Sequence, residues 1–354
     1  MTELITLTAG AVTFSDWARI AVTYSAVEAF RVFAATCADD ATGAVAFKLL
    51  PETQVGITAG ADQIFQGFVD YTEPSFDALA HKVEVQGRSA GAGIADHAAL
   101  HPSREFRGQT ILQIAQALAP PGVTFSTDIA LAPVSLFRLN PGETVHHALI
   151  RLCQVQHLAL ASRPDGSVSI TSGGATVVHP TVLRDYGAEG SAGRILRASA
   201  TFDATPKHSA FHIHGQRSLG RASLSTIRIA QTASLTKLIR TKEAIHFPNV
   251  GVDDGAARIM AQSMRDRHVG ASTTATVTLP SWRDDNGLLW QANTLIQVDA
   301  PKLQMQRNML IRQVNLTQDK EGTLAQLTLC DPAALKMGAR SSQNDHYATA
   351  KVAN

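Results

Sequence analysis

Paired cysteines are missing from this sequence of 354 residues. Its three cysteines, Cys37, Cys153 and Cys330, are odd in number and far apart, and none belongs to a CxxC pair. This pattern excludes a disulfide framework and a zinc knuckle, because both need paired cysteines at short or regular spacing. We expect buried, reduced thiols in a protein that is assembled in a cytosol.

A surplus of charge of either sign is also missing. The chain has 31 basic and 30 acidic residues, which gives a formal net charge of +1. Dedicated nucleic-acid binders carry a basic surplus, because counterion release from phosphates supplies much of their affinity. Any contact with DNA is therefore expected to be local or passing.

Long apolar runs, a secretory signal and abundant aromatic residues are absent as well. No apolar stretch approaches the roughly 20 residues that span a bilayer, and no basic stretch followed by an apolar core opens the sequence. We expect no membrane insertion. Aromatic residues make up 6% of a chain that is 45% apolar, which favours small β-domains packed with Val, Ile and Leu over a deep aromatic pocket.

What the sequence does contain is a succession of alternating segments. Within residues 1–88, apolar and polar residues alternate in stretches separated by Gly, Pro, Asp and Ser. This period of two predicts a small antiparallel barrel or sandwich. The polar stretch 73–77 lies between two such strands and is expected to form a hairpin tip.

Helical spacing replaces this alternation further along the chain. It predicts helices over 109–118 and 143–157, followed by a β-hairpin that turns at Pro164-Asp165-Gly166. Strand patterns resume at Ile195, and one more helix is expected from Asp253 or Asp254 to about His268.

The predicted fold class is α+β and mostly β. It has two similar tube-like antiparallel β-barrel domains and two small α/β domains, one of them inserted in the second barrel. The expected boundaries are 1–88 for the first barrel, 89–172 for the α/β domain, 173–216 and 274–337 for the second barrel, 217–273 for the inserted domain and 338–354 for a loose tail.

The end of the first β-region resembles the end of the second. The matched segments are 55–59 with 296–300, 68–70 with 310–312, and 81–85 with 325–329. Two alternating meanders can look alike by chance, but the matched apolar positions favour a duplicated barrel. Three copies of a duplicated chain closed into a ring would place six similar barrels around one axis, so we expect a homotrimer with a nearly six-fold surface.

An ordered set of short segments also runs through residues 4–335. The most distinctive are Ser281-Trp282-Arg283 and 287–295; the others are 87–89, 94–96, 106–115, 140–144, 165–166, 194–198 and 215–216. In this order they resemble the tail protein P family of Mu-like phages, which are baseplate hub proteins. More distantly, they resemble other contractile-tail hub proteins and the hub part of type VI secretion spikes. The segment 236–240 departs from the arginine- and proline-rich strand common in that family.

The resemblance implies a structural protein that forms a trimeric ring. Its implied partners are further copies of itself, the tail tube protein or a tube-initiating baseplate protein, the central spike protein and the baseplate wedge proteins. Phage DNA would pass through the ring without specific binding. The implied location is the virion tail baseplate, after assembly in the cytoplasm of the bacterial host.

Histidine clusters are the first candidates for a chemical site. His212 and His214 share one face of a predicted strand, with His208 nearby, but no Cys or acidic ligand completes a spaced zinc set. His146 and His147 are adjacent on a predicted helix and point to different faces, so they cannot share one ion.

Carboxylates and glycines supply the remaining candidates. Asp284 and Asp285 suggest a pair for sugar hydrolysis, yet adjacent carboxylates before Asn286-Gly287 are typical of a turn. Trp282 and Trp290 bracket that turn and are expected to be interface or core anchors, with carbohydrate stacking as the alternative.

The glycines Gly91 and Gly93 form an incomplete fingerprint without a strand–helix context for a phosphate. We therefore predict no catalytic, cofactor-binding or metal-binding residues, no cofactor, and no enzymatic activity. Two alternatives stay open. One is the hub of a contractile bacteriocin or injection machine; the other is a tail-associated cell-wall glycan hydrolase or glycan-binding module.

Overall fold

Alternating apolar residues build most of the molecule, which is mostly β with four α-helices in the described part of the chain. The structure is a computed structural model. It describes residues 3–15, 17–38, 49–76, 81–156, 158–172, 177–186, 190–218, 226–234, 240–247 and 254–335. The α+β class expected from the sequence is confirmed, whereas the segments expected at 236–239 and 338–354 lie outside the described residues.

The first strand set is antiparallel and runs in the order β3-β4-β7-β6-β5-β1-β2. Its strands are β1 (Ile5–Ala9), β2 (Val12–Phe14), β3 (Arg19–Ser25), β4 (Val32–Ala38), β5 (Gln54–Ala59), β6 (Asp62–Phe76) and β7 (His81–Ser89).

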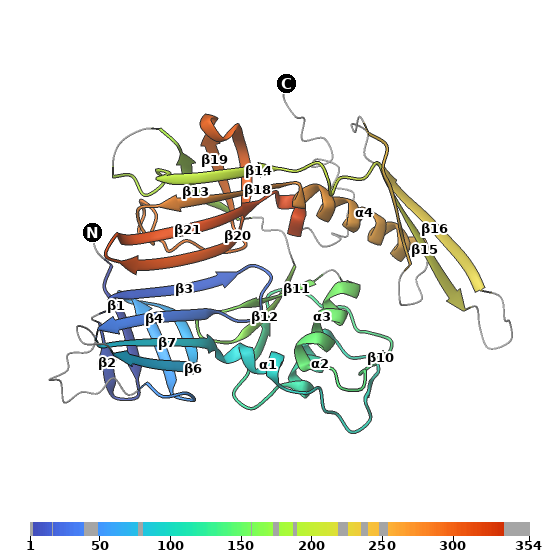
Figure 1. The fold of residues 1–354 in the computed structure, drawn as a ribbon. Helices are drawn as coiled ribbons and strands as arrows, with labels where there is room; N and C mark the ends of the chain where they lie inside the picture. Colours follow the sequence, from blue (N-terminus) through green and yellow to red (C-terminus); the bar gives the residue numbers. More distant parts are fainter. Residues whose placement is uncertain are drawn as a thin grey trace.

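The second set runs in the order β14-β18-β21-β20-β19, and β13 pairs in parallel with β19. Its strands are β13 (Val178–Arg184), β14 (Arg197–Phe202), β18 (Thr273–Leu279), β19 (Leu295–Ala300), β20 (Met305–Asp319) and β21 (Gly322–Cys330). The second half of β20 pairs antiparallel with β3, so both sets belong to one sheet (Figure 1).

Four strands of the first set match four strands of the second in length. β5 and β19 each have 6 residues, β6 and β20 have 15, β7 and β21 have 9, and β4 and β18 have 7. Each long strand is also interrupted once against its hairpin partner, at Asp70 in β6 and at Arg312 in β20. β-Bulges are specific features of a strand pair, so their equivalent positions show that the resemblance is structural.

The register corrects one part of the sequence alignment. Val85 lies opposite Thr72, and its counterpart Leu327 lies opposite Val314. The sequence comparison had matched Val85 with Leu329, two residues further on. Side chains alternate with a period of two, so a slip of two residues leaves the apolar pattern unchanged and the sequence cannot detect it.

One apolar core fills the space beneath both sets. The burial pattern of β18 alternates strictly between buried and half-buried residues, as expected for a strand with one face on a core. Buried residues from both strand sets, including residues of β1, β5 and β19, form a single apolar cluster. Trp282 and Trp290 lie completely within it. The two halves are therefore packed against each other as well as paired.

The α/β unit lies beside the first set and has its own buried cluster (Figure 1). Thr110 begins helix α2 with a capping box, in which its side chain accepts from the Gln113 N–H and the Gln113 side chain accepts from the Thr110 N–H. The elements are η1 (Ala90–Ala92), α1 (Gly93–Asp96), β8 (Glu105–Phe106), α2 (Ile111–Leu118), β9 (Phe125–Thr127), β10 (Phe137–Arg138), α3 (Val145–Gln156), β11 (Leu158–Ser162) and β12 (Val168–Ser172).

A small unit projects from the second set, at the upper right of Figure 1. It contains β15 (Ala210–Ser218), β16 (Thr226–Ser234), β17 (Glu243–His246) and α4 (Asp254–Ala271). The strands form a separate sheet in the order β16-β15-β17, and α4 packs on it through Ala257 and Ala261. Two short helices, η2 (Pro301–Leu303) and η3 (Pro332–Leu335), lie elsewhere in the second half.

The division into domains remains a proposal, and the strand pairing bears on two of its details. The sequence assigned residues 210–216 to the second barrel, whereas these residues pair with β16 and β17 in the projecting sheet. The stretch 73–76, expected at a hairpin tip, continues strand β6, and Asp77 lies outside the described residues.

Candidate interaction surfaces

The histidine pair on β15 faces away from α4. The rings of His212 and His214 are 6.5 Å apart, and the Nδ1 atom of His212 lies 3.0 Å from the Thr232 hydroxyl. The nearest acidic atom is the Glu243 Oε2, 3.4 Å from the Nε2 atom of His212. His208 instead packs against the ring of Phe211. Among the described residues, no group of three His, Cys, Asp or Glu side chains is arranged to hold a metal ion.

The carboxylates of Asp284 and Asp285 point to different segments. Asp284 accepts hydrogen bonds from the Leu288 N–H at 2.7 Å and the Thr181 hydroxyl at 3.1 Å. Asp285 accepts from the Ala192 N–H at 2.8 Å. Burial alone would raise the pKa of Asp284, but the hydrogen bonds that it accepts lower this pKa below its ordinary value. Both side chains thus fix the loop that joins β18 to β19.

A buried histidine that the sequence did not single out lies beside this loop. The ring of His179 stacks on Trp290 with 4.9 Å between centroids, and its Nε2 atom is 3.8 Å from Asp284 Oδ2. Burial lowers the pKa of His179, against the opposing influence of Asp284. Position 179 falls on an alternating strand, so its sequence context gave no signal beyond that of an ordinary strand residue.

The two tryptophans are core residues. Trp282 Nε1 donates to the Thr317 carbonyl at 3.1 Å, and Trp290 Nε1 donates to the Ser281 carbonyl at 2.9 Å. The Tyr24 hydroxyl of the first strand set donates to the Trp290 carbonyl at 2.5 Å. With both rings fully buried, they present no surface on which a sugar ring can stack.

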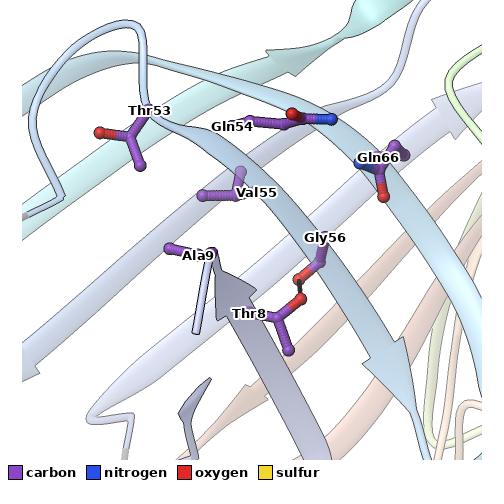
Figure 2. Close-up of a pocket in the computed structure, with 8 residues that line it drawn as sticks. Thr8, Ala9, Thr53, Gln54, Val55, Gly56 and Gln66 are labelled. Atoms are coloured by element: carbon purple, nitrogen blue, oxygen red, sulfur yellow. Dashed lines mark hydrogen bonds between the residues drawn. The ribbon is translucent and has the colours of Figure 1, made fainter. Parts of the chain in front are cut away.

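The open hollow beside β1 and β5 has no acid–base group. Figure 2 shows that it is lined by side chains such as Thr8, Gln54 and Gln66, and that Thr8 donates to the Gly56 carbonyl. None of the eight residues that line it is ionisable. This surface therefore offers hydrogen bonds and no catalytic group.

Strand edges are the more informative surface. β14 pairs only with β18 in the described chain, and Phe202 at its end is 54% exposed. The second half of β6 pairs only with β7 in the described chain, and Phe76 at its end is 86% exposed. Unpaired edges with apolar side chains are sites where another chain adds by strand pairing.

Two segments of the chain match models of known protein families. Residues 92–172 match the second domain of the gp44-like baseplate hub proteins. Residues 255–338 match the fourth domain of the Mu phage baseplate assembly protein GpP. Across 93% of this chain and 88% of the relative, the sequence is 23% identical to the baseplate hub protein gp44 of Escherichia phage Mu.

Solved structures share the fold. The 43 kDa tail protein of prophage MuSo2 from Shewanella oneidensis has a TM-score of 0.82 at 24% identity, covering 95% of this chain and 99% of the other. A component of the Escherichia coli type VI secretion system has a TM-score of 0.58 at 9% identity, covering 95% of this chain and 79% of the other. No described helix is long and apolar enough to cross a membrane.

Proposed function

We propose that this chain, a baseplate hub protein of the Mu-like phage tail type, forms a trimeric ring that joins a six-fold tail tube to a three-fold central spike. The observation that carries the proposal is the duplicated strand set, in which four strand pairs have equal lengths and the long strands have equivalent bulges. Three chains with two equivalent halves present six similar units around one axis. Such a ring meets a six-fold partner on one face while keeping three-fold symmetry.

The two halves differ in the units attached to them, and this difference gives the ring three-fold rather than six-fold symmetry. The projecting unit interrupts the second half between β14 and β18, while β3 and β4 of the first half are joined directly. In a ring, every second unit would therefore carry the projection. We propose that the sheet formed by the two strand sets contacts the tube or a tube-initiating protein. The spike and wedge proteins then contact the surfaces that carry the attached units.

The face of the strand layer opposite the core suits a passage for DNA. In the middle of this layer, the side chains that alternate with the core residues are mostly hydroxyl and amide groups: Thr23, Thr274, Thr276, Thr278, Gln313, Asn315, Thr317, Gln326 and Thr328. Neutral groups release no counterions from phosphates, so they do not hold a duplex. We propose that DNA passes this face without specific binding, in a virion baseplate assembled in the host cytoplasm.

A second setting for the same part is a phage-derived bacteriocin or injection machine, which the fold shared with a secretion component favours. The role of the chain would be the same in both. Capsid and terminase genes beside its own gene would indicate a phage, and their absence a bacteriocin.

Imaging of assembled baseplates tests the hub proposal directly. Averaged images of the particle, with the chain identified by a fused tag, are expected to show three copies on the tail axis between tube and spike. Six copies, or copies at the periphery, would overturn the proposal. Muramidase activity of the purified protein would instead support the cell-wall hydrolase alternative.

A further inference from the structure

We infer that the ring closes through a β-seam in which residues 71–76 of one copy pair antiparallel with residues 198–203 of the next. This inference rests on the proposed ring and specifies its contact residue by residue. β14 ends the sheet of a single copy, and the second half of β6 extends beyond its pairing with β5, so each leaves one edge unpaired among the described residues. The occupant of each edge is a second copy of this chain, because the chain already contains the same seam internally.

The internal seam joins the two halves of one chain. There, residues 313–318 of β20 pair antiparallel with residues 20–25 of β3, so Asn315 lies opposite Thr23 and Thr317 lies opposite Ala21. The Thr23 hydroxyl donates to the Asn315 side-chain oxygen at 3.2 Å. Within the duplication, β6 corresponds to β20 and β14 corresponds to β3. The internal seam is therefore a template for pairing β6 with the β14 strand of another copy.

The bulges fix the correspondence of β6 with β20. Immediately after its bulge, β6 has Tyr71 opposite Gln86, and β20 has Gln313 opposite Thr328. Tyr71 is therefore the counterpart of Gln313. Counting onward along the strand, Glu73 corresponds to Asn315 and Ser75 corresponds to Thr317.

The neighbouring strands carry the correspondence across to β14. In the first half, Gln86 lies opposite Ala34, which lies opposite Ala21. In the second half, Thr328 lies opposite Thr276, which lies opposite Ser199. Ser199 is therefore the counterpart of Ala21, and Thr201 two residues later is the counterpart of Thr23.

The register of the seam between copies follows from these counterparts. Ser75 of one copy lies opposite Ser199 of the next, and Glu73 lies opposite Thr201. The second pair gives the Thr201 hydroxyl a carboxylate acceptor where the internal seam has an amide. Hydrogen bonds to a charged acceptor are stronger than neutral ones, so this contact adds to the stability of the seam.

The exposure of Phe202 at the end of β14 supports the seam between copies. On the internal seam, Tyr24 is buried at the end of β3. Its counterpart Phe202 lies on the core-facing side of β14, yet its side chain is 54% exposed in the single chain. Pairing with β6 of another copy would cover Phe202.

Pro74 on β6 has no N–H to donate, so the seam between copies is weaker than the internal one.

Cysteine cross-linking of the full-length chain tests this register. We would prepare the double variant Ser75→Cys/Ser199→Cys and treat it with a short bifunctional thiol reagent, since facing Cβ atoms in antiparallel strands are about 4.5–5.5 Å apart. Glu73→Cys/Thr201→Cys is a second pair on the same exposed face, in case the first variant folds poorly. The native cysteines are buried, and burial raises the pKa of Cys153 and Cys330 to about 12, so they stay unreactive.

Two control variants calibrate the result. Ala21→Cys/Thr317→Cys lies on the internal seam and should cross-link within one chain. Ser75→Cys/Ala200→Cys moves one cysteine to the opposite face of β14, and it should not cross-link.

The outcomes separate the seam from the ring. The inference predicts cross-linked dimers and trimers for the two seam pairs on a denaturing gel. A trimer by native mass spectrometry, with cross-linking at the internal pair and none at either seam pair, would overturn the seam and leave the ring standing. A monomer at high protein concentration, without intermolecular cross-links, would overturn both.

Discussion

Arg283 binds two carboxylates of the first half, and their unequal burial gives a sharp prediction. Its guanidinium donates to Glu3 through Nε and Nη2 at 3.0–3.1 Å and to Asp62 through Nη1 at 2.6 Å. Nη2 also donates to the Ala59 carbonyl at 2.7 Å. The contact ties the loop that joins β18 to β19 to strands of the other half.

Distance and burial rank the two ion pairs in opposite order. The Asp62 contact is shorter, but the Asp62 side chain is 55% exposed. The side chains of Glu3 and Arg283 are only 16% and 21% exposed, and their contact is shared between two nitrogens. Solvent screens exposed pairs to about 0.2–1 kcal/mol, whereas hydrogen bonds to charged groups contribute about 1.5–3 kcal/mol. We expect a coupling energy of about 1–2 kcal/mol for Glu3, and about 0.3 kcal/mol for Asp62.

Two double-mutant cycles measure these couplings. Glu3→Gln and Asp62→Asn would each be combined with Arg283→Met, and the free energy of unfolding would be taken from urea titrations. Each cycle cancels the cost of the carbonyl acceptors that Arg283→Met leaves unpaired. Fluorescence of the buried Trp282 and Trp290 reports the transition, and circular dichroism checks that it is a single step. An Asp62 coupling equal to or larger than the Glu3 coupling would refute the reasoning.

Three further predictions concern the core and the loop. Trp282→Ala should lower the free energy of unfolding by about 3–5 kcal/mol; a loss under 1 kcal/mol in a urea titration would contradict its complete burial. Gly87→Ala places a Cβ atom 2.1 Å from the Phe68 carbonyl oxygen and should cost at least about 1–3 kcal/mol. The control Gly93→Ala meets a methyl group at 3.3 Å and should keep the melting temperature within a few degrees of the wild type. Because the folded-state pKa of Asp284 is lowered, its ionised form stabilises the fold above about pH 4. The stability difference between wild type and Asp284→Asn should be full at pH 7 and shrink as pH falls below 4; a difference that grows in acid would contradict the assignment.

The three longer helices, α2, α3 and α4, were predictable because their signals are local. Thr110 with Gln113 forms a capping box, and Asp254 begins α4 as expected for an acidic helix start. The duplication was also visible, since matched strands keep their apolar positions. The full length of β6 was not, because its bulge at Asp70 shifts the alternation from one face to the other and divides one strand into two shorter patterns.

Contacts between distant segments were beyond the reach of the sequence. An alternating strand such as 210–218 shows which of its faces is buried and says nothing about which sheet it joins. His179 and Arg283 have their roles only because loops about 100 or more residues away lie beside them. The strand edges that form the proposed seam could not be predicted from the sequence either, because a strand is an edge only when no other strand pairs with one of its sides in the folded sheet.

The place where the projecting unit enters the sheet has an evolutionary consequence. Phe202, the last residue of β14, pairs with Thr273, the first residue of β18, and the Asp203 N–H donates to the Ser272 carbonyl at 2.8 Å. The chain therefore leaves and re-enters the sheet at one point, as a hairpin loop does. A gene can gain, exchange or lose such an inserted unit without shifting the register of the strands on either side of it. Proteins descended from one ancestor can thus differ in the unit that they carry while they keep the same sheet.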